Sequence, residues 1–153
     1  MSVSDDTRND HLLHFTVVND LREIAVAADR IDEFCSVHGI PPATAYAVNL
    51  SVDELLTNTI SYGYEDSGEH RIDLRIRRDG DVLTIEISDD GVEFAPDSAK
   101  DPDTAASIED RPIGGLGIFL TRQMMDSFDY KRNEGRNIVT LTKKTGTASP
   151  ENQ

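Results

Sequence analysis

Apolar and polar residues alternate along several stretches of the chain, with the period of two that is typical of a β-strand burying one face. The clearest stretch contains Ile72, Leu74 and Ile76, with charged residues at the positions between them. This pattern and the turn signals between stretches predict where the strands lie. They are expected at residues 11–18, 71–78, 82–88, 128–132 and 137–143.

Other stretches repeat apolar residues every three to four positions, the period of an α-helix with one buried face. We expect helices over residues 20–38, 43–63 and 115–126. Asn19 or Asp20 can cap the first helix. Its expected core residues are Leu21, Ile24, Ala28, Ile31 and Cys35.

The order of these elements predicts an α+β fold, built as a two-layer sandwich. Asp79-Gly80 and Asn133-Glu-Gly135 are turn signals that join neighbouring strands as hairpins. One face of each strand is charged, so helices should cover only the other face of an antiparallel or mixed sheet.

The chain is expected to fold as one domain over residues 11–144, between disordered tails at residues 1–10 and 145–153. Within the domain, residues 89–113 show neither a strand nor a helix pattern. An irregular segment of roughly 25 residues is uncommon in a domain of this size and is usually functional. Residues 97–113 are therefore expected to form a lid.

Composition excludes several classes of protein. Fifteen basic and 29 acidic residues give a formal net charge of −14, which argues against nucleic acid or an anionic membrane as the main partner. The single cysteine, Cys35, excludes an intramolecular disulfide and a cysteine-built zinc site. No apolar run could span a membrane and the polar start is no signal peptide, so we expect a cytoplasmic protein.

The expected helix over residues 43–63 carries a carboxylate and an amide one turn apart, at Glu54 and Asn58. Both lie about a third of a turn from the apolar stripe, at the rim of the core. A carboxylate can accept a proton, and an amide oxygen is a hard ligand that suits Mg²⁺. From these residues alone, two surface polar side chains remain the simpler interpretation.

Two further patterns border the irregular segment. Asp89 ends a strand shortly before Gly91, which can adopt a positive φ or let a ligand approach the backbone. A buried carboxylate there could accept a hydrogen bond from an exocyclic amine such as that of adenine, and a plain Asp-Gly turn is the alternative. Gly114, Gly115 and Gly117 enter the last helix, where unpaired amides can bind an anion, or they form a flexible hinge.

Together the patterns E-x-x-x-N, D-x-G-x-x-F-x-P and G-G-L-G-I resemble the motifs of the GHKL ATPase superfamily, whose members share the Bergerat ATP-binding fold. The resemblance covers residues 12–143. The matching residues are Glu54 and Asn58 in the N box, Asp89 and Gly91 in the G1 box, and Gly115 and Gly117 in the G2 box.

The D-G-x-x-F-x-P variant, the short length and the run NTISYGY are similar to anti-sigma-factor serine kinases of the RsbW and SpoIIAB type. This resemblance implies ATP and Mg²⁺ as cofactors, with Asn58 holding the metal and Glu54 taking the proton from a serine hydroxyl. It also implies a sigma factor and a STAS-domain anti-anti-sigma protein as partners, and a homodimer. Tyr62 departs from the pattern, because these kinases often have histidine there.

Arg111 lies close to the glycines and is a candidate to reach the γ-phosphate or a docked partner, or it is a solvated loop arginine. Two other functions stay open. A nucleotide-gated protein could sequester a partner without chemistry, although such a binder would not need Glu54 at the position of the base. A detached histidine-kinase ATPase domain is disfavoured by the residues after Gly91.

Overall fold

The computed structural model describes residues 7–8, 11–93 and 115–146, which form a six-stranded sheet and three helices. The elements are β1 (Thr7–Arg8), β2 (Leu12–Val18), α1 (Glu23–Val37), α2 (Pro42–Tyr62), β3 (Arg71–Asp79), β4 (Val82–Asp89), α3 (Gly115–Met124), β5 (Ser127–Asn133) and β6 (Arg136–Lys144). The strand order is β1-β2-β3-β4-β6-β5, and every neighbouring pair is antiparallel. The predicted α+β two-layer sandwich is confirmed.

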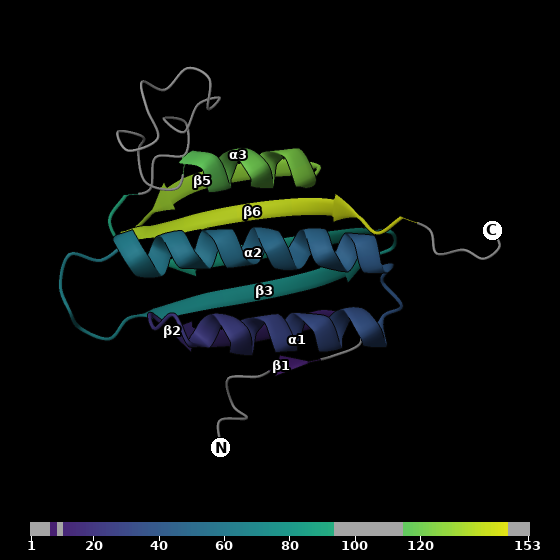
Figure 1. The fold of residues 1–153 in the computed structure, drawn as a ribbon, viewed down its shortest axis with the longest axis horizontal. Coiled ribbons are helices and arrows are strands. Elements are labelled where there is room, and N and C mark those ends of the chain that lie inside the picture. The colour runs from purple at the N-terminus through teal and green to yellow at the C-terminus, as the bar shows by residue number, and fades with distance from the viewer. Residues whose placement is uncertain (1–6, 9–10, 94–114, 147–153) are drawn as a thin grey trace.

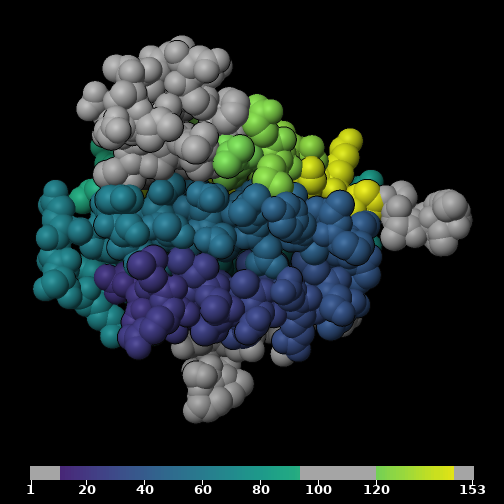
Figure 2. Space-filling model, in the orientation of Figure 1, coloured from purple at the N-terminus to yellow at the C-terminus, as the bar shows by residue number. Residues whose placement is uncertain are grey.

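All three helices lie on one face of the sheet (Figure 1). Ile72, Leu74 and Ile76 point to that face and are fully buried, as their alternation predicts. They share one apolar core with Val52 and Leu56 of α2. Figure 2 shows α1 and α2 side by side over this core, with α3 beyond α2. None of the described helices is long and apolar enough to cross a membrane.

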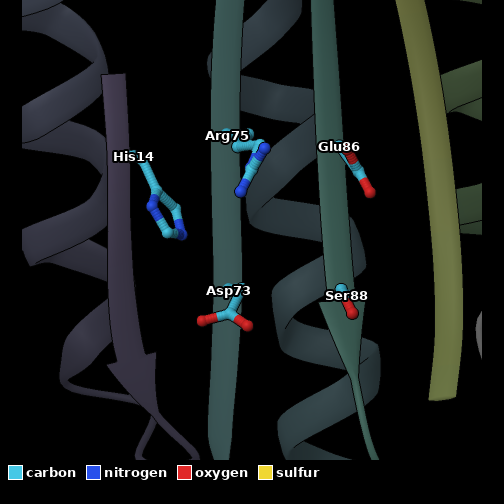
Figure 3. A pocket seen from close by; sticks show the side chains of 5 residues that line it. All are labelled: His14, Asp73, Arg75, Glu86 and Ser88. Atoms are coloured by element: carbon cyan, nitrogen blue, oxygen red, sulfur yellow. The ribbon is translucent and has the colours of Figure 1, made fainter. Parts of the chain in front are cut away.

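The other face of the sheet is polar, and no described helix covers it. Figure 3 shows five side chains that project from β2, β3 and β4 on the side away from the helices. They are His14, Asp73, Arg75, Glu86 and Ser88, and they line a shallow hollow of about 290 Å³. The charged face that the sequence predicted is therefore the uncovered one.

Helix α1 begins later than predicted, at Glu23 instead of residue 20. Neither candidate caps it. Asp20 accepts a hydrogen bond from the backbone N–H of Arg22 at 2.9 Å, and Asn19 binds the backbone of a neighbouring loop. Leu21, which was expected in the core, consequently precedes the helix and is 55% exposed.

Each predicted tail contains residues that form backbone hydrogen bonds with the folded domain. In the expected N-terminal tail, Thr7 and Arg8 pair with β2. In the expected C-terminal tail, Thr145 is buried, and its backbone N–H donates to the carbonyl of Asp81 at 2.7 Å. Short polar segments of this kind have no periodicity of their own, so tertiary pairing determines their structure.

The two hairpins form as predicted, but the first one turns one residue later. Asp79 is paired with Val82, so the two-residue loop is Gly80-Asp81, with φ of +59° at Gly80. The second loop is Glu134-Gly135, within the predicted turn.

Candidate functional site

Asp89, the residue expected to bind the adenine amine, ends β4 and is only 6% exposed. Its Oδ1 accepts hydrogen bonds from the backbone N–H of Gly91 at 2.8 Å and from Nδ2 of Asn137 at 2.9 Å. No residue in the described part of the chain donates to Oδ2. The carboxylate therefore has a fixed orientation and one acceptor available for a ligand.

Asn137 on β6 organises the whole turn after β4. Its Nδ2 also donates to the Val92 carbonyl at 2.8 Å. Its Oδ1 accepts from the Tyr130 hydroxyl at 2.7 Å and from Nη1 of Arg132 at 3.0 Å. Arg132 Nη1 donates in addition to the Gly91 carbonyl at 2.8 Å. Two strands distant in sequence thus fix the conformation that Asp89 adopts.

Asn137, Tyr130 and Arg132 were not predicted as site residues from the sequence. One signal could have identified Asn137. It alternates with Val139 and Leu141, which are buried, so an amide occupies a core position of the strand. A buried polar side chain needs hydrogen-bond partners, and this one finds them around Asp89.

The turn after β4 packs directly against the end of α2. The backbone N–H of Val92 donates to the carbonyl of Gly63, the C-cap residue of that helix, at 2.8 Å. A Cβ on Gly91 would lie 2.5 Å from the same carbonyl oxygen, too close for any side chain. The φ of Gly91 is not positive. The glycine is therefore required by the close approach of two protein segments, and not by a left-handed backbone.

Asn58 and Glu54 lie on α2 and make no hydrogen bond or ion pair with the residues that the structure describes. Asn58 is about one turn before the end of the helix, and its Nδ2 is buried with no hydrogen-bond partner. Glu54 is half-buried and makes no hydrogen bond or ion pair. Buried polar atoms rarely lack a partner in a complete structure. The orphaned Nδ2 is a hydrogen-bond donor, so it fits a ligand that supplies an acceptor such as a phosphate oxygen, whereas a metal would bind Oδ1 of the same amide.

A metal at Asn58 would depend on the ligand for most of its coordination. The described residues contain no group of three or more His, Cys, Asp or Glu side chains that could hold a metal ion. Mg²⁺ commonly keeps several waters and binds through one or two protein ligands and substrate phosphates. The described residues suit that mode of binding. They do not form a site in which protein side chains supply all the ligands.

The Tyr64 hydroxyl lies close to Asp89 and is another buried polar group that has no hydrogen-bond partner among the described residues. Its phenol oxygen is buried and unpaired. Burial, and next the charges of Asp89 and Asp90, raise the pKa of Tyr64 well above its ordinary value. The hydroxyl therefore stays protonated and available as a donor to a ligand.

The remaining predicted site residues are only partly placed. Gly115 and Gly117 are the first and third residues of α3, which packs against α2. Arg111, Gly114 and the predicted lid at 97–113 lie outside the described residues. The hollow of Figure 3 is on the opposite face of the sheet from α2 and is not part of this site.

Comparisons with known proteins agree with this arrangement. The family profile described as a histidine kinase-like ATPase domain matches residues 17–143. The serine/threonine-protein kinase BtrW of Bordetella bronchiseptica is 31% identical over 104 residues, which are 68% of this chain and 73% of BtrW. The serine-protein kinase RsbW of Listeria monocytogenes is 30% identical over 98 residues, 60% of this chain and 61% of RsbW. The chain thus spans about three fifths of that relative.

One solved structure has the same fold at much lower sequence identity. It contains the RsbU and RsbW domains of Rv1364c from Mycobacterium tuberculosis. The TM-score is 0.61 and the identity 13%, with 87% of this chain and 32% of that chain covered.

Proposed function

Because the chain belongs to the histidine kinase-like ATPase family, we propose that it is an ATP-dependent protein-serine kinase that also acts as an anti-sigma factor. It would bind a sigma factor in one state and phosphorylate a STAS-domain anti-anti-sigma protein in another, in the cytoplasm. The names of two relatives, a serine/threonine-protein kinase and a serine-protein kinase, support the reaction class.

The observation that carries this proposal is the contact between the Asp89 turn and the end of α2. The 2.8 Å hydrogen bond from Val92 to Gly63 joins a fixed carboxylate acceptor to the helix on which Asn58 lacks a partner. Glu54 lies one turn further back on the same helix. A ligand with a base at one end and phosphates at the other fits this combination of groups.

Each site residue then has a distinct role. Asp89 accepts a hydrogen bond from the adenine amine, and Asn58 holds Mg²⁺. When bound, the ion neutralises charge on the phosphates. The backbone amides of Gly115 and Gly117, at the N-terminus of α3, donate to phosphate oxygens. Glu54 takes the proton of the serine hydroxyl. The serine oxygen then bonds to the γ-phosphorus, and ADP leaves.

Arg111 and the lid at residues 97–113 complete the proposed site. We assign Arg111 to the γ-phosphate or to a docked partner, and the lid to covering the phosphates. Exclusion of water favours transfer to a serine over wasteful hydrolysis of ATP.

The proposed partner surface includes α1, and the proposed state is a homodimer. Leu21 and Val26, just before and within α1, are 55% and 45% exposed. Exposed apolar side chains of this kind can contribute to a protein contact, and they support α1 as part of the partner surface.

The test is incubation of the purified protein with γ-labelled ATP, Mg²⁺ and a STAS-domain protein encoded beside it. Transfer of label to a serine of that protein is the expected result. The Glu54→Ala variant serves as the negative control. Absence of transfer with every such protein, under conditions where ATP binds, would contradict the kinase assignment.

Tyr62 favours a second function, a nucleotide-gated protein that sequesters its partner without phosphorylating it. The side chain is 55% exposed and makes no hydrogen bond or ion pair with the described residues. It stands where the related kinases often have histidine. Partner binding that depends on nucleotide, without any transfer of label, would support this alternative.

A further inference from the structure

The loop between α2 and β3 is organised around His70. Its ring stacks on Tyr64, with ring centroids 4.1 Å apart and 11° between the planes. Its backbone N–H donates to Oδ1 of Asn19 at 2.8 Å. The side chain is only 20% exposed. The loop itself and the segment after β2 therefore fix the position of the imidazole.

Both ring nitrogens of His70 face carboxylates. Nε2 lies 2.8 Å from Oδ1 of Asp66 in the same loop, and Nδ1 lies 3.3 Å from Oδ1 of Asp90 in the turn after β4. A neutral imidazole has one N–H and can donate to one of these acceptors, whereas an imidazolium donates to both. The two-sided arrangement therefore favours the protonated ring.

The charges around the ring act in the same direction. The hydrogen bond to Asp66 raises the pKa of His70 above its ordinary value, and Asp90 adds to the effect against partial burial. Among the described residues, no charged group other than Asp66 and Asp90 acts on the ring. Tyr64 covers one face as a neutral phenol, and Asn19 binds only the backbone.

His70 thereby connects the loop after α2 to the turn that contains Asp89. Asp90 is the next residue, and its carboxylate is the only part of this turn that reaches the ring among the described contacts. A second link lies close by, because the Val92 N–H donates to Gly63, the residue before Tyr64. With both links formed, the turn is held against the loop at two points.

We propose that His70 is a positioning residue for nucleotide binding: its protonated ring ties Asp90 to the loop after α2 and so fixes the turn that orients Asp89. The inference rests on the proposed nucleotide site. Loss of the proton removes the ion pair between Nδ1 and Asp90 and leaves the Asp90 carboxylate facing a neutral ring. Nucleotide affinity should therefore decrease as pH rises through the pKa of His70.

The experiment measures ADP affinity in the presence of Mg²⁺ from pH 6 to pH 8.5 by calorimetry. The proteins are the wild type, His70→Gln, Asp90→Asn and the control His14→Gln. His14 lies on the open face of the sheet and has no described partner (Figure 3). Its substitution removes an imidazole without changing the turn. Titration of ADP itself is common to all four proteins and cancels when affinities are compared at one pH.

We expect His14→Gln to follow the wild type at every pH. His70→Gln should bind ADP about fivefold more weakly than the wild type at low pH, the lower end for coupling between two sites. The difference should disappear at high pH. Asp90→Asn should also lose the pH dependence. A wild-type pH profile in His70→Gln overturns the proposal, and so does one in Asp90→Asn, because a remote charge would then explain the effect.

A proton NMR titration of the histidine rings separates this proposal from the proposed function. His70 should titrate above the ordinary histidine range, and lower in Asp66→Asn. Saturation with ADP should raise its pKa further, because protonation and binding are linked reciprocally. If ADP binds and leaves the pKa of His70 unchanged, the positioning role alone is overturned. If ADP does not bind at any pH, the proposed function fails and the positioning role fails with it.

Discussion

Asp89 and Asn58 lie in two parts of the candidate site that the protein builds in different ways. Asp89 is held by hydrogen bonds from Gly91 and Asn137, and strands β5 and β6 brace the turn around it. Asn58 and Glu54 project from α2 and make no hydrogen bond or ion pair with other described residues, and Nδ2 of Asn58 is buried without a partner. The protein therefore preorganises the part proposed for adenine, and the phosphates and metal must complete the other part.

This difference implies that binding and chemistry can be separated by mutation. Substitutions in the α2 part should affect phosphates, metal and proton transfer, whereas substitutions around Asp89 should affect recognition of the base.

Glu54→Ala should lower the rate of phosphotransfer by about 10²–10⁴, the usual contribution of a general base. ATP affinity should stay unchanged, since Glu54 makes no hydrogen bond or ion pair with the described residues that hold the base-binding turn. Single-turnover assays and calorimetry give the two values. Glu86→Ala, which removes an unpaired carboxylate on the open face, is the matched control. Weaker ATP binding in Glu54→Ala would place this residue among the binding groups.

Asn58→Ala should abolish measurable Mg-ATP affinity or lower it by at least about 100-fold, the upper end for losing a residue that supports a metal ligand. The effect arises because the variant loses the only amide oxygen offered to the metal by α2 at this position. Titrations with Mg²⁺ and with EDTA provide the measurement. An equal loss of affinity in both buffers would show that Asn58 binds the nucleotide and not the ion.

Asp89→Asn should weaken binding of every adenine nucleotide by about 10- to 100-fold, because a hydrogen bond to a charged group contributes about 1.5–3 kcal/mol. The substitution replaces part of the acceptor with a donor that would face the adenine amine. Affinities for ATP, ADP and adenosine should fall together. Asp129→Asn, on an exposed strand position, is the control. Unchanged affinity in Asp89→Asn would mean that Asp89 does not bind the base.

Asn137→Ala should lower the free energy of unfolding by about 1–3 kcal/mol, because it leaves buried partners around Asp89 without hydrogen bonds. ATP affinity should fall as well, since the turn loses its brace. Urea denaturation and calorimetry test both effects, with Thr140→Ala on the outer side of β6 as the control. A stable Asn137→Ala variant with normal affinity would contradict the preorganised turn.

Tyr62→His should change ATP affinity by no more than about twofold, as expected for an exposed side chain that makes no hydrogen bond with the described residues. It introduces the residue that related kinases often have. Transfer of label to the STAS-domain protein is measured in parallel. A variant that gains phosphotransfer from an inactive wild type would favour the sequestering function for the natural chain.

The sequence predicted those features that depend on local periodicity. Alternation around Ile72, Leu74 and Ile76 gave β3 its correct buried face, and helical spacing placed Glu54 and Asn58 at the rim of the core. These patterns arise within one element, so no knowledge of other segments is needed to read them.

Features that depend on contacts between distant segments were not predicted from the sequence. Asn137 reaches Asp89 only because β4 and β6 are neighbours in the sheet, with these two residues paired in register. His70 reaches Asp90 only because the loop after α2 folds back toward the turn after β4. Leu21 was misplaced because Asp20 binds Arg22 and delays the start of α1. In each case a tertiary contact determines the role of a residue whose local sequence is neutral.

Binding of adenosine tests the division between the two parts of the site most directly, because adenosine has a base but no phosphate and recruits no metal. An NMR titration detects even weak binding and can be repeated on Asn58→Ala and Asp89→Asn. We predict that Asn58→Ala binds adenosine as the wild type does and that Asp89→Asn loses this binding. Equal losses in the two variants would contradict the account.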